Sequence, residues 1–173
     1  LVVGYAPTLT TVSTLAGGTE DTALTISYET LAAAANEADV DGSAPSFRVE
    51  AVSTGTLTKG GTAVTAGTTL LSSGESLEWT PAAHANGTLN AFTVKAYDGA
   101  LASATAIQVQ VVVAAVADAP VLTSVTALTG ATEDSSYEIT YAQLVINSDV
   151  ADADGDAISF RIEAVNSGTL EKW

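Results

Sequence analysis

An internal repeat is the feature that most constrains how this chain can fold. Residues 7–59 align with residues 120–172 at a single offset, 120 − 7 = 113, without a gap, and 27 of these 53 positions are identical. The shared pieces include Thr19-Glu20-Asp21 with Thr132-Glu133-Asp134. A match of this length without gaps does not arise by chance, so the chain holds one complete repeat of 113 residues and about the first half of the next.

The repeat also sets the expected domain boundaries. We expect residues 1–6 to end a preceding linker, residues 7–116 to form a complete domain, residues 117–120 to form a linker, and residues 121–173 to be the N-terminal half of a second repeat. A β-sandwich domain takes about 100 residues. The chain is therefore long enough for one full domain and part of another.

Short alternating segments between turn residues predict the fold class. They cover residues 7–15, 23–28, 46–52, 76–80, 91–97 and 104–113, with a turn at Gly17-Gly18. Lys59-Gly60-Gly61 joins residues 56–58 to residues 63–65 as a hairpin, and the Ala-rich residues 29–38 allow a short helical turn. This spacing predicts an all-β fold, an antiparallel Greek-key β-sandwich. The expected bulky core residues are Phe47, Trp79, Phe92 and Tyr97, with the alternative that Tyr97 places its hydroxyl at a strand end.

Composition and missing motifs exclude several function classes. Twenty acidic residues against five basic ones give a formal net charge of -15 at pH 7, which repels nucleic acid and anionic lipid surfaces. The absence of Cys removes thiolate chemistry, and one histidine without a Gly-x-Ser-x-Gly motif leaves no serine triad. The longest apolar run, residues 109–116 interrupted by Gln110, is too short to span a bilayer. We expect no enzymatic activity, no nucleic-acid partner and no membrane insertion, with His84 a loop residue.

Two acidic loops occupy the same place in the two repeats. They are Val150-Ala-Asp-Ala-Asp-Gly-Asp156 and Asp39-Val-Asp-Gly-Ser43. Alternating aspartates followed by glycine put carboxylates on one side of a tight loop, which suits a Ca²⁺ ion with its six to eight oxygen ligands. The same residues also make ordinary turns, because Asp bonds its own nearby backbone and Gly accepts a positive φ. Both interpretations stay open for Asp152 and Asp154 and for Asp39 and Asp41.

Several motifs resemble those of cadherin and of bacterial cadherin-like tandem repeats, the extender repeats of large RTX/VCBS-type surface adhesins. They are Ala151-Asp-Ala-Asp-Gly-Asp156, Ala96-Tyr-Asp-Gly99, Val116-Ala-Asp-Ala-Pro-Val121, Thr19-Glu-Asp-Thr22 and Trp79-Thr-Pro81. The resemblance covers essentially the whole chain. It implies Ig/cadherin-like sandwiches in tandem, acting as a structural and adhesive part of a large secreted or cell-surface bacterial protein.

The same resemblance implies calcium at the junction between consecutive domains. The ligands it indicates are Glu20, Asp118, Asp152 and Asp154, with Asp21 or Asp156 assisting. Asp39, Asp41 and Asp98 would meet at the N-terminal end of the first repeat. We expect that site to be weaker, because Tyr5 stands where the second repeat has Asp118, and Ser43 where it has Asp156. Neighbouring repeats of the same polypeptide are the expected partners.

Two other functions also fit the sequence. A carbohydrate- or protein-binding module would expose an aromatic platform, for which Tyr5, Tyr28, Trp79, Tyr97 and Trp173 are available. A subunit of an extracellular filament would accept a strand from a like chain at unpaired sheet edges of the second repeat.

Overall fold

The structure is a computed structural model that describes residues 4–42 and 44–172. The chain splits into two compact units, Leu1–Val116 and Ala117–Trp173, and each is described here by itself. Ser43, Trp173 and the first three residues of the expected preceding linker lie outside the described residues. Among the residues that are described, no helix has the length and apolar character needed to cross a membrane.

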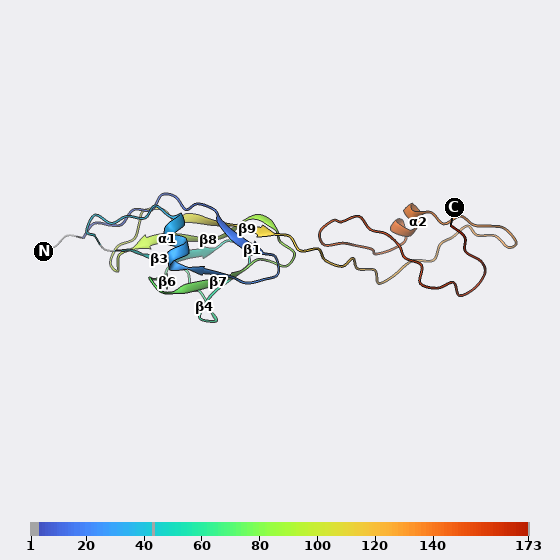
Figure 1. The fold of residues 1–173 in the computed structure, drawn as a ribbon, viewed down its shortest axis with the longest axis horizontal. Coiled ribbons are helices and arrows are strands. Elements are labelled where there is room, and N and C mark those ends of the chain that lie inside the picture. Colours follow the sequence, from blue (N-terminus) through green and yellow to red (C-terminus); the bar gives the residue numbers. More distant parts are fainter. Residues whose placement is uncertain (1–3, 43, 173) are drawn as a thin grey trace. The chain divides into compact units, whose positions relative to one another are not determined.

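The first unit is a sandwich of two β-sheets, which confirms the predicted all-β fold (Figure 1). All neighbouring strands pair antiparallel except β1, which runs parallel to β9. The five-stranded sheet has the order β1 (Leu15–Thr19), β9 (Ile107–Ala114), β8 (Gly87–Tyr97), β3 (Ser46–Val52) and β6 (Leu70–Leu71). The four-stranded sheet has the order β2 (Leu24–Ser27), β7 (Ser76–Thr80), β4 (Thr56–Lys59) and β5 (Thr62–Ala63).

Alternate side chains of these strands build the core, as the period-two pattern predicts. Three of the four expected bulky core residues, Phe47, Trp79 and Phe92, have no exposed surface. The prediction for Tyr97 is wrong. Phe92, Val94 and Ala96 point inward from β8, so Tyr97 points to the outer face, where its O–H donates to Gly99 O at 2.9 Å and its ring lies 5.2 Å from the Arg48 guanidinium carbon.

The start of the first unit differs from the prediction. Residues 7–14 form only two isolated bridges, Thr8 to Ala38 and Val12 to Ala35, and the regular strand β1, which begins at Leu15, contains the glycine pair predicted as a turn. A Cβ on Gly18 would lie 3.0 Å from Val112 O, so the missing side chain lets β1 approach β9. Gly17 adopts a φ of 93°, and the register of the pair shifts between Leu15 and Gly18.

The predicted helical turn is present as α1 (Tyr28–Ala34). Ser27 caps it, because its side chain accepts a hydrogen bond from the Thr30 N–H at 3.1 Å. Leu31 on this helix is fully buried in the core. The chain after the helix then pairs with residues 8–12, which leads directly into the first acidic loop.

The second unit repeats several local features of the first. Its helix α2 (Tyr141–Ile146) matches α1 and begins with a capping box between Thr140 and Gln143. The bridges Val121 to Ala151 and Val125 to Ser148 fall 113 residues after those of the first unit. The aromatic contact also recurs, with ring centroids 5.6 Å apart for Tyr28 and Phe47 and 5.7 Å apart for Tyr141 and Phe160.

The second unit has no strand within residues 117–172. Residues 159–165, the counterpart of β3, are not a strand. Positions that are buried in the first unit are open here. Ile139, Ile162 and Leu170 are 45%, 59% and 50% exposed, whereas their counterparts Ile26, Val49 and Leu57 are buried.

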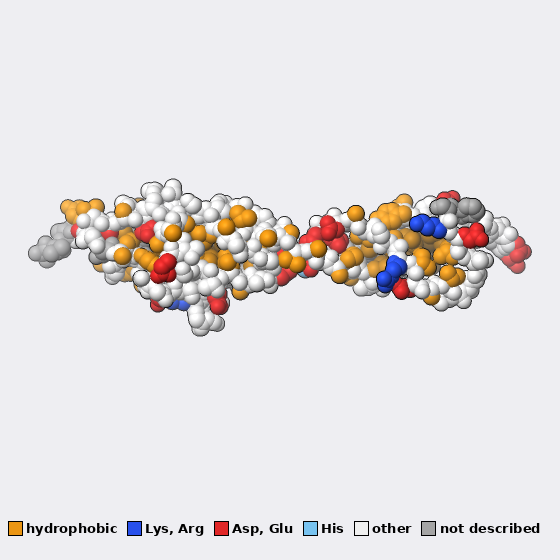
Figure 2. Space-filling model, in the orientation of Figure 1, with side chains coloured by type: hydrophobic (Ala, Val, Ile, Leu, Met, Phe, Trp, Pro, Cys, Tyr) orange, Lys and Arg blue, Asp and Glu red, His pale blue; other side chains and the backbone are white. Residues whose placement is uncertain are grey.

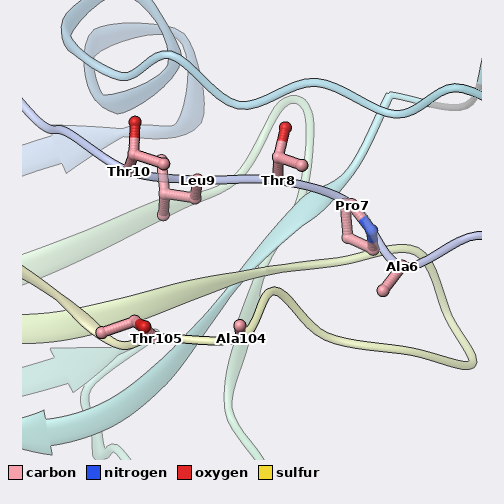
Figure 3. A pocket seen from close by; sticks show the side chains of 7 residues that line it. All are labelled: Ala6, Pro7, Thr8, Leu9, Thr10, Ala104 and Thr105. Carbon is pink, nitrogen blue, oxygen red and sulfur yellow. The ribbon is translucent and has the colours of Figure 1, made fainter.

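A groove of about 300 Å³ runs along the first unit, between its N-terminal segment and the chain that enters β9 (Figure 3). Leu9 points toward Thr105 and Ala104, while the hydroxyls of Thr8 and Thr10 point away from them (Figure 3). None of the seven residues that line the groove is ionisable, so their side chains offer no acid or base: Ala6, Pro7, Thr8, Leu9, Thr10, Ala104 and Thr105.

Candidate metal centre

Three aspartates form an acidic cluster in the second unit. Carboxylate oxygens of Asp152, Asp154 and Asp156 all lie within 4.8 Å of one another, and Figure 2 shows acidic side chains gathered at one end of this unit. Asp152 Oδ1 accepts hydrogen bonds from the backbone N–H groups of Asp154 and Asp156, each at 3.0 Å. Gly155 completes the turn with a φ of 75°. The carboxylates therefore share one side of a tight loop, as the sequence pattern predicts.

Asp154 is the member of this cluster whose surroundings best fit a cation. Its Oδ2 accepts a hydrogen bond from the Asp118 N–H at 2.6 Å, and its Oδ1 is buried without a hydrogen-bond partner. A buried carboxylate oxygen without a partner costs free energy that a bound cation would offset. The oxygen-only donor set is the kind that Ca²⁺ prefers.

The matching loop of the first unit has the same backbone contacts. Asp41 Oδ2 accepts a hydrogen bond from the Tyr5 N–H at 2.7 Å, and Asp39 Oδ1 accepts one from the Asp41 N–H at 2.8 Å. Tyr5 stands at the Asp118 position of the repeat, so the loop holds the preceding segment through the backbone whichever side chain is there. Asp39 Oδ2 is also buried without a hydrogen-bond partner.

Glu37 is a buried acid near this loop that the sequence prediction did not single out. Its Oε2 is buried without a hydrogen-bond partner, and burial raises the pKa of its carboxyl group. Asp39 and Gly42 close a turn, and within residues 4–42 and 44–172 the carboxylates of Glu37, Asp39 and Asp41 do not form a group close enough to share one ion. Val150 occupies the Glu37 position in the second repeat.

Asp98 is engaged by its own loop. Its Oδ1 accepts hydrogen bonds from the Leu101 N–H at 2.6 Å and the Ala100 N–H at 2.7 Å, and these bonds lower the pKa of the Asp98 carboxyl group. Within residues 4–42 and 44–172, no group of three acids close enough to share an ion combines Asp98 with Asp39 and Asp41.

Glu20 and Asp21 follow β1 directly. Glu20 is only 2% exposed, and its carboxylate accepts hydrogen bonds from the Val116 N–H and, at 3.3 Å, from the Asn86 side-chain amide. Asp21 has a φ of 55° and accepts the His84 N–H at 3.0 Å. His84 lies in the loop between β7 and β8, and its Nδ1 is 3.6 Å from Asp21 Oδ2. Glu20 therefore anchors the end of β9 to the end of β1.

A carbohydrate-binding module needs exposed aromatic side chains, and two of the predicted candidates are held within the first unit. Trp79 is fully buried, and its indole N–H donates to Thr54 O at 2.8 Å. Tyr28 packs on Phe47 and donates its O–H to Pro45 O at 2.9 Å. Tyr5 is 61% exposed and Tyr97 is half-buried on the outer face of β8, while Trp173 lies outside the described residues.

The fold and the acidic loops together define a structural β-sandwich module. Residues 5–111 match the model of the bacterial Ig domain family, and the chain belongs to that family. Searches of curated proteins and of solved structures gave no match. Bacterial Ig domains are typically non-enzymatic, and they commonly occur in surface or extracellular proteins.

Proposed function

We propose that the chain is a structural extender and adhesion module of a large secreted or cell-surface bacterial protein, stiffened by calcium at the junction between consecutive repeats. The observation that carries this proposal is the buried, partnerless oxygen of Asp154, which belongs to a cluster of three carboxylates. The ungapped repeat supports it, because the same backbone contacts recur in the loop of the first unit. The repeats act in series as cadherin-like spacers.

Chain connectivity supports the proposed ligands. In the first unit Glu20 binds the Val116 N–H, and in the second unit Asp154 binds the Asp118 N–H. Residues two positions apart have backbone nitrogens at most about 7 Å apart, because each residue spans at most about 3.6 Å. Carboxylates bound to so short a segment repel each other until a cation neutralises them. The ion then has Glu20, Asp118, Asp152 and Asp154 as ligands, with Asp21 or Asp156 assisting.

A second, weaker calcium site is proposed at the start of the first repeat. Asp39 and Asp41 supply its ligands, and a buried oxygen of Asp39 has no hydrogen-bond partner. Tyr5 contributes no acid where the second repeat has Asp118. The partner that completes this site is a preceding repeat of the same polypeptide.

Thermal unfolding with calcium or with chelator, at equal ionic strength, tests the proposal. A ligand that binds only the folded state at 100 times its Kd stabilises that state by about 2.7 kcal/mol. Since 1 kcal/mol shifts Tm by roughly 4–8 °C for a domain of 60–100 residues, the expected rise exceeds several degrees.

Asp154→Asn and Glu20→Gln should each remove most of this rise. Glu133→Gln is the matched control, because Glu133 occupies the Glu20 position in the second repeat and is exposed. Equal melting with calcium and with chelator would contradict the proposal, and so would a full calcium response in the Asp154→Asn variant.

A further inference from the structure

Asn86 differs chemically from the other asparagines of this chain. It is followed by glycine, whereas Asn36, Asn90, Asn147 and Asn166 are followed by residues that carry a Cβ. An asparagine side chain can be attacked by the backbone nitrogen of the next residue, which closes a five-membered ring. A Cβ on that next residue hinders the approach, and glycine removes the hindrance.

The structure leaves open space around the Asn86-Gly87 peptide. Asn86 is exposed and is the last residue before β8, at the end of the loop that contains His84. Gly87 has a φ of 86°, and no atom lies within 4 Å of the position that a Cβ would occupy. Neither burial nor crowding on that side protects the Asn86-Gly87 peptide.

The Asn86 amide is also loosely held. Its hydrogen bond from Nδ2 to Glu20 Oε2 is 3.3 Å long, beyond the usual 2.7–3.2 Å for such bonds. The amide of Asn36, in contrast, accepts two backbone N–H groups at 3.0 and 2.9 Å and donates to Thr10 Oγ1 at 2.6 Å. The Asn147 amide donates to Gln143 O at 2.8 Å.

We infer that Asn86-Gly87 is a self-modification site of the folded module, at which Asn86 is converted to aspartate or isoaspartate. The Gly87 backbone nitrogen loses its proton and forms a bond to Asn86 Cγ, and the Cγ–Nδ2 bond breaks, releasing ammonia. Water then opens the ring at either carbonyl group. No oxidant or other reactant is needed.

The product changes the end of the first unit. A carboxylate at position 86 replaces a hydrogen-bond donor beside Glu20, so two carboxylates lie close together and one of them, that of Glu20, is buried. The isoaspartate form also adds a main-chain atom immediately before Gly87, which pairs with Val113 of β9. Conversion therefore weakens the module with age, whether or not calcium binds there.

Peptide mapping by mass spectrometry tests the conversion. The purified full chain is incubated under native conditions at neutral and at mildly alkaline pH, and the loss of amide is followed at all five asparagines. Conversion should be fastest at Asn86 and faster at the higher pH, because the attacking nitrogen must be deprotonated. Conversion at Asn86 no faster than at Asn147 or Asn166 would overturn the inference.

Two variants show whether ring closure by the Gly87 nitrogen causes the conversion. Thr88→Ala destroys the Asn-x-Thr glycosylation signal but keeps Asn-Gly, and it should convert as the parent chain does. Asn86→Gln keeps the amide but lengthens the side chain, and position 86 should then stay unchanged. Loss of conversion in Thr88→Ala would contradict the inference, as would equal conversion at position 86 in Asn86→Gln.

The consequence is tested with the product itself. Asn86→Asp should melt below Asn86→Gln at neutral pH, because the new carboxylate lies beside that of Glu20. Equal melting of the two variants would show that the new carboxylate does not disturb Glu20.

Discussion

At position 55 the backbone leaves no room for a side chain. A Cβ on Gly55 would lie 2.1 Å from the carbonyl oxygen of Thr80, and Gly55 has a φ of 70°. Overpacking of this kind costs roughly 1–3 kcal/mol, and a left-handed backbone costs about 1–2 kcal/mol for a residue with a Cβ. We predict that Gly55→Ala lowers the free energy of unfolding by more than about 2 kcal/mol, measured by urea denaturation.

Gly60→Ala is the matched control for that substitution. Gly60 also has a positive φ, 56°, but nothing lies within 4 Å of its Cβ position, so only the backbone strain remains. If both variants lose the same free energy of unfolding, the contact with Thr80 does not add to the destabilisation.

The buried carboxyl of Glu37 should make stability depend on pH. Because its pKa is raised, the folded state binds the proton more tightly than the unfolded state does. Its contribution to stability is therefore complete below the ordinary glutamate pKa and is lost as pH rises through the raised value. In the presence of chelator, Glu37→Gln should melt above the parent chain at neutral pH and together with it in acid.

Glu29 provides a control of opposite sign. The Gly74 N–H, bonded to Glu29 Oε1 at 3.0 Å, lowers the pKa of Glu29, so its contribution is present at neutral pH and is lost as pH falls. Glu29→Gln should not stabilise the chain at neutral pH. A Glu37→Gln variant that melts below the parent chain at neutral pH would contradict the prediction for Glu37.

At the scale of the elements, prediction succeeded where local pattern and final structure agree. The observed bounds of β3 and β7 are those predicted, because buried and less buried residues alternate along β7 and along β3 as far as the register shift between Val49 and Ala51. β1 was missed because Gly17-Gly18 resembles a turn, whereas the long-range contact with β9 decides its conformation. The short β6, Leu70–Leu71, has too few residues to show any period.

Some features of the candidate site follow from local sequence, whereas others depend on the fold. The positions of Asp152, Asp154 and Asp156 follow from the local spacing of the loop, so the sequence was sufficient to predict that their carboxylates gather. The burial of Glu37 depends on the fold around it, which no local pattern specifies. The use of Asp98 by its own loop also depends on backbone geometry, since Asp-Gly alone fits both a turn and a ligand.

At the scale of the whole molecule, charge sets the conditions for testing calcium. A net charge of -15 disfavours the compact state through self-repulsion, and any salt screens part of it. A calcium effect on joint stiffness must therefore exceed that of sodium at equal ionic strength. Calcium binding depends on specific ligand residues, whereas screening of the net charge by salt does not.

The decisive property is whether the two units tumble together. We predict that calcium brings the rotational correlation times of the first and second units, measured by NMR relaxation, to a common value, and that chelator lets them differ. An ion with ligands from both units would tie their orientations, whereas a flexible linker leaves each unit to rotate on its own. Asp118→Asn should reduce the coupling and Glu133→Gln should preserve it. If correlation times stay different in saturating calcium, the ion does not stiffen the junction, even where calcium raises the Tm of one unit.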